Sequence, residues 1–188
     1  GKLLQNYKDV SRQGVKLTKY VITGGAGFIG RNFIDYIYRK EPSAEVTVLD
    51  KLGYSGLLDN IESFRSRNGF RFLHGDICNP NDIRKTAHDA NIVVNFAAEA
   101  AVDRSITATE SFLQTNIIGV YTLLNELKKS TILEKVIQVS TDEVYGQIYQ
   151  GSFIESSELK PRNPYAASKL AGERLAYSFY ETYDIPII

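Results

Sequence analysis

Two groups of side chains in the second half of the sequence have the spacing for acid–base chemistry. Tyr165 and Lys169 are four residues apart, so on a helix they share one face. A nearby ammonium lowers the pKa of a tyrosine, so the pair predicts that Tyr165 takes a proton from an alcohol while hydride leaves its carbon. The same spacing, taken alone, also fits two unrelated surface residues.

Asp142 and Glu143 form the second group, directly after Thr141. Two adjacent carboxyl groups can act as an acid and a base when their surroundings separate their pKa values. Hydride transfer needs neither, whereas elimination of water needs one group to protonate the leaving hydroxyl and another to remove a proton. Thr141 can hydrogen-bond the reacting hydroxyl. In isolation, these residues would be interpreted as a solvated acidic turn.

The glycine-rich segment 23–30 is predicted to bind a dinucleotide. Its three spaced glycines follow a predicted strand and open a predicted helix, which is the context that this motif requires. Gly24 permits the tight turn, Gly27 lets the backbone approach a pyrophosphate, and Gly30 lets the helix pack against the sheet. The N–H groups and the positive dipole end of the helix then attract the phosphates.

Two acidic residues suggest which dinucleotide binds. Asp50 follows Gly30 by 20 residues, and a carboxylate there accepts hydrogen bonds from the ribose and repels a 2′-phosphate. This favours NAD over NADP, although the neighbouring Lys51 would soften the exclusion of NADP. Asp76, after the third predicted strand, is a candidate acceptor for the adenine amino group, and a plain turn residue is the alternative.

The elements that position these residues alternate along the chain. Short β-prone runs indicate strands and amphipathic stretches indicate helices. The predicted strands are residues 20–23, 45–50, 70–74, 92–96 and 135–140, and the predicted helices are residues 28–40, 109–129 and 163–183. This alternation predicts an α/β fold with a parallel sheet and helices on both faces. Residues 187–188 look like the middle of a sixth strand.

Composition argues against several classes of protein. The 188 residues carry 22 basic and 22 acidic side chains, whereas a nucleic-acid binder normally has a basic excess. The single cysteine, Cys78, predicts a cytoplasmic location. No run of apolar residues predicts a membrane span, and no cluster of His and Cys predicts a metal site. Residues 1–18 are predicted to be an N-terminal extension, and residues 19–188 a single domain.

Several segments together resemble the extended short-chain dehydrogenase/reductases over residues 18–188. They are residues 23–30 (TGGAGFIG), 50–52 (DKL), 75–77 (GDI), 102–106 (VDRSI), 140–146 (STDEVYG) and 164–169 (PYAASK). Within that family the sequence is most similar to the dTDP-glucose 4,6-dehydratases, chiefly through STDEVYG. The resemblance implies a Rossmann-type doubly wound sheet, NAD, a nucleotide-activated glucose as substrate, most readily dTDP-glucose, and a homodimer formed through residues 109–129 and 164–183.

The resemblance also implies roles for individual residues. NAD would be bound by Phe28, Ile29, Asp50, Lys51, Leu52, Gly53, Asp76, Ile77, Phe96, Ala97, Ala98, Glu99, Thr115, Tyr165 and Lys169. Thr141 would bind the sugar, Asp142 would be the acid and Glu143 the base. The family usually has Ser-His where this chain has Ala100 and Ala101. Ala100 therefore lacks a substrate-binding hydroxyl, which leaves the nucleotide base open.

The implied reaction oxidises C4, eliminates water across C5–C6 and returns hydride to C6, giving a 4-keto-6-deoxy sugar. A nucleotide-sugar epimerase or decarboxylase of the same superfamily is one alternative, and it has no need of Asp142 and Glu143. A non-catalytic NAD-binding protein is another, and it has no need of Tyr165 and Lys169. The family continues into a substrate-binding domain that this sequence does not contain, so weak or no turnover is expected of the chain as it stands.

Overall fold

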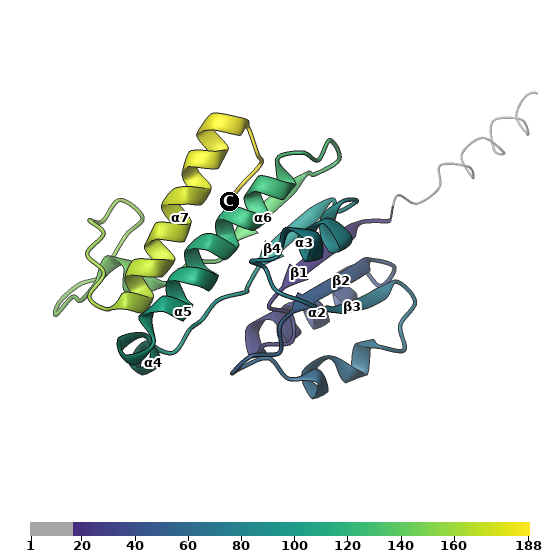
Figure 1. Cartoon of the computed structure of the whole chain (residues 1–188), viewed down its shortest axis with the longest axis horizontal. Helices are drawn as coiled ribbons and strands as arrows, with labels where there is room; N and C mark the ends of the chain where they lie inside the picture. Colours follow the sequence, from purple (N-terminus) through teal and green to yellow (C-terminus); the bar gives the residue numbers. More distant parts are fainter. Residues whose placement is uncertain (1–16) are drawn as a thin grey trace, which may run out of the picture.

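In the computed structural model, which describes residues 17–188, five parallel strands form the centre of the fold (Figure 1). They are β1 (Lys19–Thr23), β2 (Glu45–Asp50), β3 (Phe70–His74), β4 (Ile92–Asn95) and β5 (Lys135–Gln138). Their order across the sheet is β3-β2-β1-β4-β5, and a parallel bridge from Val136 to Ile187 continues beyond β5. This is the strand order of a Rossmann fold, which confirms the predicted fold class. Most of the predicted extension, residues 1–18, lies outside the described residues.

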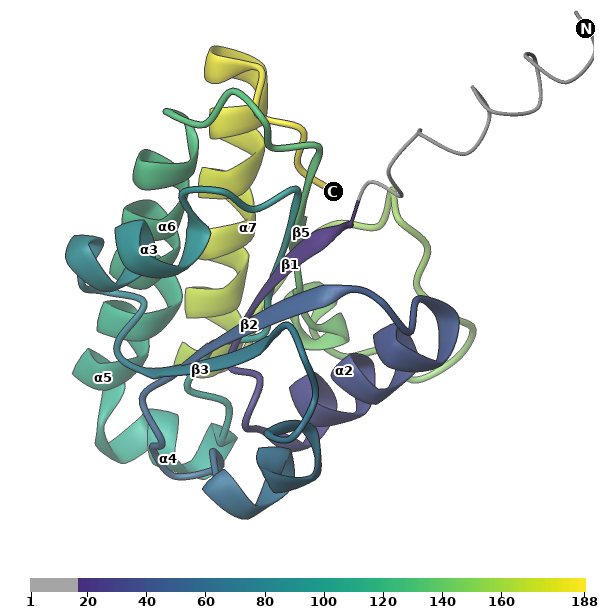
Figure 2. The ribbon, with the colours of Figure 1, turned by 90° about the vertical axis from the view of Figure 1, so that its right-hand side faces the viewer.

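Helices cover both faces of the sheet, as Figure 2 shows. On one face lie α3 (Pro80–Ala87), α6 (Val120–Leu127) and α7 (Pro164–Tyr183), and on the other lie α2 (Phe28–Lys40) and the 3-10 helix η2 (Leu58–Phe64). Successive residues of a strand point to opposite faces, so in β1 Val21 joins the first core and Ile22 the second. The central strands are therefore apolar on both sides, as expected of a covered parallel sheet.

The helix predicted over residues 109–129 is interrupted in the structure. After α4 (Val102–Thr107), the chain forms α5 (Thr109–Leu113), a π-helical turn η3 (Gln114–Gly119) and then α6. Within η3, the side chain of Asn116 bonds both backbone groups of Glu99, accepting from the N–H at 2.9 Å and donating to the C=O at 3.0 Å. A π turn is a local distortion that often re-aims side chains at a functional site, and here it directs Thr115 and Asn116 inward.

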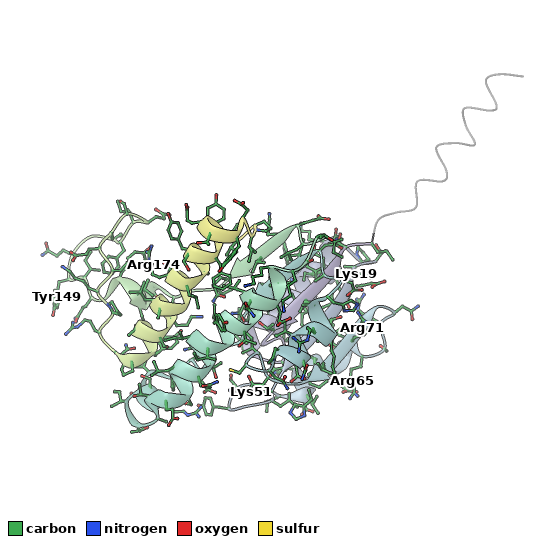
Figure 3. The ribbon with its side chains drawn as sticks, turned by 45° about the horizontal axis from the view of Figure 1, so that its top comes forward. Lys19, Lys51, Arg65, Arg71, Tyr149 and Arg174 are labelled. Carbon is green, nitrogen blue, oxygen red and sulfur yellow. The ribbon has the colours of Figure 1, made fainter. Side chains whose placement is uncertain are left out.

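The segments that carry the predicted site residues all follow the carboxyl ends of strands. The glycine-rich segment follows β1, Asp50 ends β2, and the short 3-10 helix η4 (Asp142–Tyr145) follows β5. Parallel strands share one carboxyl edge, and ligands of open α/β sheets bind outside that edge. Figure 3 shows Lys51, just after β2, well separated from Lys19, which begins β1 at the opposite edge.

Candidate active site

A cavity of about 420 Å³ opens at the carboxyl edge of the sheet. Most of the residues selected from the sequence line it: Gly24, Gly27, Phe28, Ile29, Gly30, Asp50, Lys51, Gly53, Asp76, Ile77, Phe96, Ala97, Ala98, Glu99, Ala100, Thr115, Tyr165 and Lys169. Four others, Leu52, Thr141, Asp142 and Glu143, are not among its lining residues. The structure therefore gathers the predicted cofactor residues around one space, with the acidic pair outside its wall.

The glycine-rich segment is packed too tightly for side chains. Gly24 has φ +69°, and a Cβ there would lie 2.6 Å from the backbone of Phe96 and Ala97. A Cβ on Gly30 would lie 2.5 Å from the carbonyl oxygen of Gly24. The close approach that Gly30 permits is thus to the turn that directly follows β1. Gly25, which the sequence analysis did not select, is held against Val48, 2.8 Å from a Cβ position.

The first turn of α2 faces the cavity without a capping side chain. Gly27 is the N-cap residue and has no side chain to accept from the N–H groups that follow it. Phe28 and Ile29 line the cavity and are 80% and 63% exposed. A helix N-terminus left in this state favours an anionic ligand, so the local geometry fits a pyrophosphate.

Asp50 joins two loops as well as facing the cavity. Its Oδ2 accepts from the Ala26 N–H at 2.9 Å, and its Oδ1 accepts from the Leu52 N–H at 2.8 Å. Leu52 adopts a positive φ of 54°, and a Cβ on Gly56 would lie 2.6 Å from Asp50 Oδ1. The carboxylate therefore shapes both the glycine-rich turn and the loop after β2, a role that the sequence analysis missed.

Replacing Asp50 by asparagine is expected to destabilise the protein by about 2 kcal/mol, because the amide NH2 would face a backbone N–H where an acceptor is needed. Urea unfolding measures the change. Asp59→Asn, at an exposed position in the first turn of η2, is the matched control and should change stability by less than about 0.5 kcal/mol. Equal stability of the Asp50 variant and the wild type would contradict the two-loop role.

Lys51 links the loop after β2 to the segment after β4 and to η3. Its Nζ lies 3.0 Å from Glu99 Oε1 and donates to Thr115 Oγ1 at 3.1 Å. Arg104 approaches the other oxygen of Glu99 at 3.5 Å and lies over the Tyr54 ring. The suggestion that Lys51 softens the exclusion of a 2′-phosphate loses support, because its ammonium is already paired with a carboxylate.

Asp76 serves as a turn residue while it lines the cavity. Its Oδ1 accepts from the Cys78 N–H at 2.8 Å, and its own N–H donates to Asp82 at 3.1 Å. Burial is the main cause that raises the pKa of the Cys78 thiol to about 11, so this cysteine is a poor nucleophile. A single carboxylate can hold the turn and still accept a hydrogen bond at its second oxygen.

Tyr165 is half-buried, with its ring edge-on to the fully buried Phe112 at 6.3 Å. Burial raises the pKa of Tyr165, a hydrogen bond with Thr141 opposes the rise, and the charges of Glu143 and Asp142 add to it. The predicted lowering of this pKa is therefore wrong for the structure. The charges of both carboxylates therefore act on the phenol, although neither side chain lines the cavity.

The ammonium of Lys169 is bound to the backbone just after β5. Its side chain is buried, and its Nζ donates to the Val139 carbonyl oxygen at 2.6 Å. Burial lowers the pKa of Lys169 to about 8, and the charge of Glu173 opposes this. The helical spacing correctly places Tyr165 and Lys169 on one side of α7, but the ammonium binds the end of β5.

The buried ammonium predicts an unusual pH dependence of stability. An unfolded lysine has a pKa near 10.5, so below about pH 8 both states are protonated and the folded state bears the full burial cost. The cost disappears as pH rises from about 8 to 10.5. Lys169→Met should therefore be more stable than the wild type at pH 7 by about 2 kcal/mol, with a gap that narrows over this range. Urea unfolding across pH tests this, with the exposed Lys160→Met as control.

The turn that carries the acidic pair is attached to α7. Thr141 is the N-cap of η4, and its Oγ1 accepts from the Glu143 N–H at 3.3 Å. Glu143 Oε2 accepts from Asn163 Nδ2 at 2.7 Å, and Asn163 Oδ1 accepts from the Ala166 N–H at 2.7 Å as the N-cap of α7. The start of the Tyr165 helix and the position of Glu143 are thus fixed by one side chain.

Eight lining residues were not selected from the sequence: Leu49, Tyr54, Ser55, Gly56, Gly75, Ala101, Val139 and Ser140. Glycines on both sides of Tyr54 and Ser55 were the available signal for the loop after β2, since Gly53 and Gly56 allow close approach of the backbone. Ser140 directly precedes the acidic turn. Within residues 17–188, no group of three acidic, His or Cys side chains is arranged to hold a metal ion, and no helix is long and apolar enough to cross a membrane.

Comparison with known proteins gives consistent matches over most of the chain. Residues 21–188 match the family described as GDP-mannose 4,6 dehydratase. A low-salt glycan biosynthesis protein, Agl12, of Haloferax volcanii is 44% identical over 89% of this chain and 54% of its own. A dTDP-glucose 4,6-dehydratase of Actinoplanes sp. is 39% identical over 90% of this chain and 54% of its own. The chain thus spans about half the length of the curated relatives it matches.

One solved structure is similar to this chain in both fold and sequence. The dTDP-glucose 4,6-dehydratase from Streptomyces venezuelae, crystallised with NAD bound, superposes with a TM-score of 0.86 at 40% identity. The match covers 90% of this chain and 54% of that one. The cavity described above therefore belongs to a part of the fold that this neighbour also has.

Proposed function

From the fact that the chain belongs to the GDP-mannose 4,6 dehydratase family, within the extended short-chain dehydrogenase/reductases, we propose that it carries the NAD site and the acid–base groups of a nucleotide-sugar 4,6-dehydratase. This is a lyase activity, with dTDP-glucose as the first substrate to test. Residues 19–188 form the NAD-binding domain in this proposal. The dTDP-glucose 4,6-dehydratases among the relatives support it.

NAD fits the residues that line the cavity. Gly24 lets the turn pack against the backbone of Phe96 and Ala97, and the first turn of α2 follows Gly27 without a capping side chain, open to a pyrophosphate. Asp50 faces the same space as an acceptor for the adenosine ribose, and Asp76 and Ile77 would flank adenine. Tyr165 and Lys169 would hold the nicotinamide ribose. NAD held there would supply the acceptor for a hydride from C4 of the sugar and the donor for its return at C6.

The remaining chemistry falls to side chains around Tyr165. Tyr165 would take the proton of the 4-hydroxyl, and the resulting ketone makes the C5 hydrogen acidic. Glu143 would remove that hydrogen as a proton while Asp142 would protonate the departing C6 hydroxyl, so one water leaves. A hydride returned to C6 and a proton returned to C5 from Glu143 would then give the 4-keto-6-deoxy sugar with no net oxidation. Thr141 would hydrogen-bond the sugar. General acids and bases placed in this way each contribute about 10²- to 10⁴-fold to a rate.

The observation that carries the proposal is the position of the acidic pair relative to the phenol. The turn η4, which carries Asp142 and Glu143, packs against α7, and Asn163 holds Glu143 at the start of this helix. Oxidation of an alcohol uses the tyrosine alone. Elimination of water needs the two carboxyl groups as well, so their presence beside Tyr165 favours a dehydratase over an epimerase or a simple NAD-binding protein.

Mass spectrometry of the sugar nucleotide tests the proposal. The natural protein that carries this chain is incubated with catalytic NAD and either dTDP-glucose or UDP-glucose, run side by side. Loss of one water without accumulation of reduced cofactor is the expected result, and the preferred base shows what Ala100 permits. An isomer of unchanged mass would support an epimerase. NAD binding without any turnover of either sugar would support the non-catalytic alternative.

We further propose a homodimer formed through α5, α6 and α7, in the cytoplasm. The helices α6 and α7 lie side by side in Figure 1. Apolar side chains are exposed along this part of the chain: Leu113, Ile118, Tyr121, Tyr177 and Tyr180. Light scattering should give twice the chain mass for the wild type and the chain mass for Tyr180→Glu, since a charge at such an interface is unpaired.

A further inference from the structure

Glu173 lies on α7 beyond the two residues proposed for chemistry. It follows Lys169 by four positions and Tyr165 by eight, so the three share one side of the helix. Its Oε2 accepts from Ser140 Oγ at 2.8 Å, and its Oε1 pairs with the exposed Arg174 at 3.2 Å. Ser140 lines the cavity and directly precedes Thr141.

We propose that Glu173 is a positioning residue: through Ser140 it holds the acid–base turn, residues 141–143, in register with the helix that carries Tyr165. The inference rests on the proposed function for its catalytic consequence. Glu173 itself does not line the cavity, and it has no assigned role in the reaction. Its effect must therefore pass through Ser140 and Lys169.

Two parallel attachments join α7 to the chain that leaves β5. Lys169 Nζ donates to the carbonyl of Val139 at 2.6 Å, and one turn later Glu173 accepts from the hydroxyl of Ser140 at 2.8 Å. A single hydrogen bond permits rotation about itself, whereas two consecutive bonds fix the direction of the strand end. Thr141, the N-cap of η4, directly follows Ser140, so the starting direction of η4 is set by this pair of contacts.

The second attachment includes a charge that acts on Lys169. Burial lowers the pKa of Lys169, and Glu173 is the charged group that opposes it. The other acidic side chains nearby act elsewhere: Asp142 and Glu143 act on Tyr165, and Glu99 pairs with Lys51. Glu173 therefore helps to keep the ammonium protonated while it holds Val139.

Two substitutions separate the hydrogen bond from the charge. Glu173→Gln keeps an oxygen that can accept from Ser140 but removes the charge, so the titration midpoint of Lys169 should fall by about half a pH unit or more. The side-chain NMR signal of ¹³C-labelled lysine, assigned by its loss in Lys169→Met, measures the midpoint. Glu181→Gln, exposed on the same helix, should leave it unchanged. An unchanged midpoint in Glu173→Gln overturns the electrostatic part.

A double-mutant cycle tests the positioning part. Ser140→Ala and Glu173→Leu should each lower kcat by about tenfold, with the NAD dissociation constant preserved, and the double variant should be no worse than either single one. An additive, roughly hundredfold loss would overturn the linkage. If the wild type does not dehydrate either sugar, the proposed function fails, and the same cycle on urea midpoints, together with the Lys169 titration, still decides the contact.

Discussion

Replacing Tyr165 by phenylalanine is expected to lower kcat for water elimination by about 1,000-fold, because the hydroxyl that takes the first proton is lost. The ring remains, and with it the edge-on contact to Phe112. Since the glycine-rich segment, Asp50 and Lys169 are untouched, the affinity for NAD should fall only by the loss of one hydrogen bond to the nicotinamide ribose, about tenfold or less. Steady-state kinetics by mass spectrometry and NAD titration by fluorescence measure the two quantities separately.

The same helix supplies the control for this substitution. Tyr177 is 56% exposed and lies beyond the cavity, so Tyr177→Phe should leave kcat within error of the wild type. A Tyr165 variant that keeps full turnover would remove this residue from the mechanism. A variant that loses NAD affinity in parallel with kcat would instead assign Tyr165 to cofactor binding alone.

Gly24→Ala is expected to destabilise the protein by about 3 kcal/mol and to weaken NAD binding by more than about tenfold. A residue with a Cβ costs roughly 1–2 kcal/mol in the left-handed conformation that Gly24 adopts at φ +69°. The new Cβ would also overlap the backbone of Phe96 and Ala97 at 2.6 Å, which adds a packing cost of about 1–3 kcal/mol. Urea unfolding and NAD titration measure both effects.

A second glycine of the same cavity serves as the control for Gly24. At Gly53 the nearest atoms to an added Cβ belong to the flexible side chain of Lys51, at 3.4 and 3.8 Å. Gly53→Ala should therefore be stable and still bind NAD. If both alanine variants behave alike, the tight packing described for the glycine-rich segment is not what makes Gly24 necessary.

The strands and the outline of the cavity were predictable from the sequence because their signals are local. Val21 and Ile22 belong to a short apolar run, and such a run followed by glycines and then by a helix has few other interpretations. Asp50 and the glycine-rich segment were recognisable by their spacing. Their contact with each other, through the Ala26 N–H, was not predicted, since it joins residues 24 positions apart.

The features that were not predicted depend on long-range contacts. The π turn in the helix at residues 114–119 accompanies the bonds of Asn116 to Glu99 and to Ser168, which are 17 and 52 positions away. Helical periodicity does not indicate hydrogen-bond partners that are so distant in the sequence. The hydrogen bond of Lys169 to Val139 was also not predicted, because spacing fixes the face of a helix while a distant acceptor fixes the rotamer.

The shared side chain of Asn163 has a consequence for motion. Its oxygen holds the Ala166 amide and its nitrogen holds Glu143, so fraying of the first turn of α7 releases both together. Local opening of helix ends is a frequent fluctuation with its own free energy. The hydrogen-exchange rate of the Ala166 amide therefore reports how often the helix end opens. The same measurement gives the fraction of time for which Glu143 is released from Asn163.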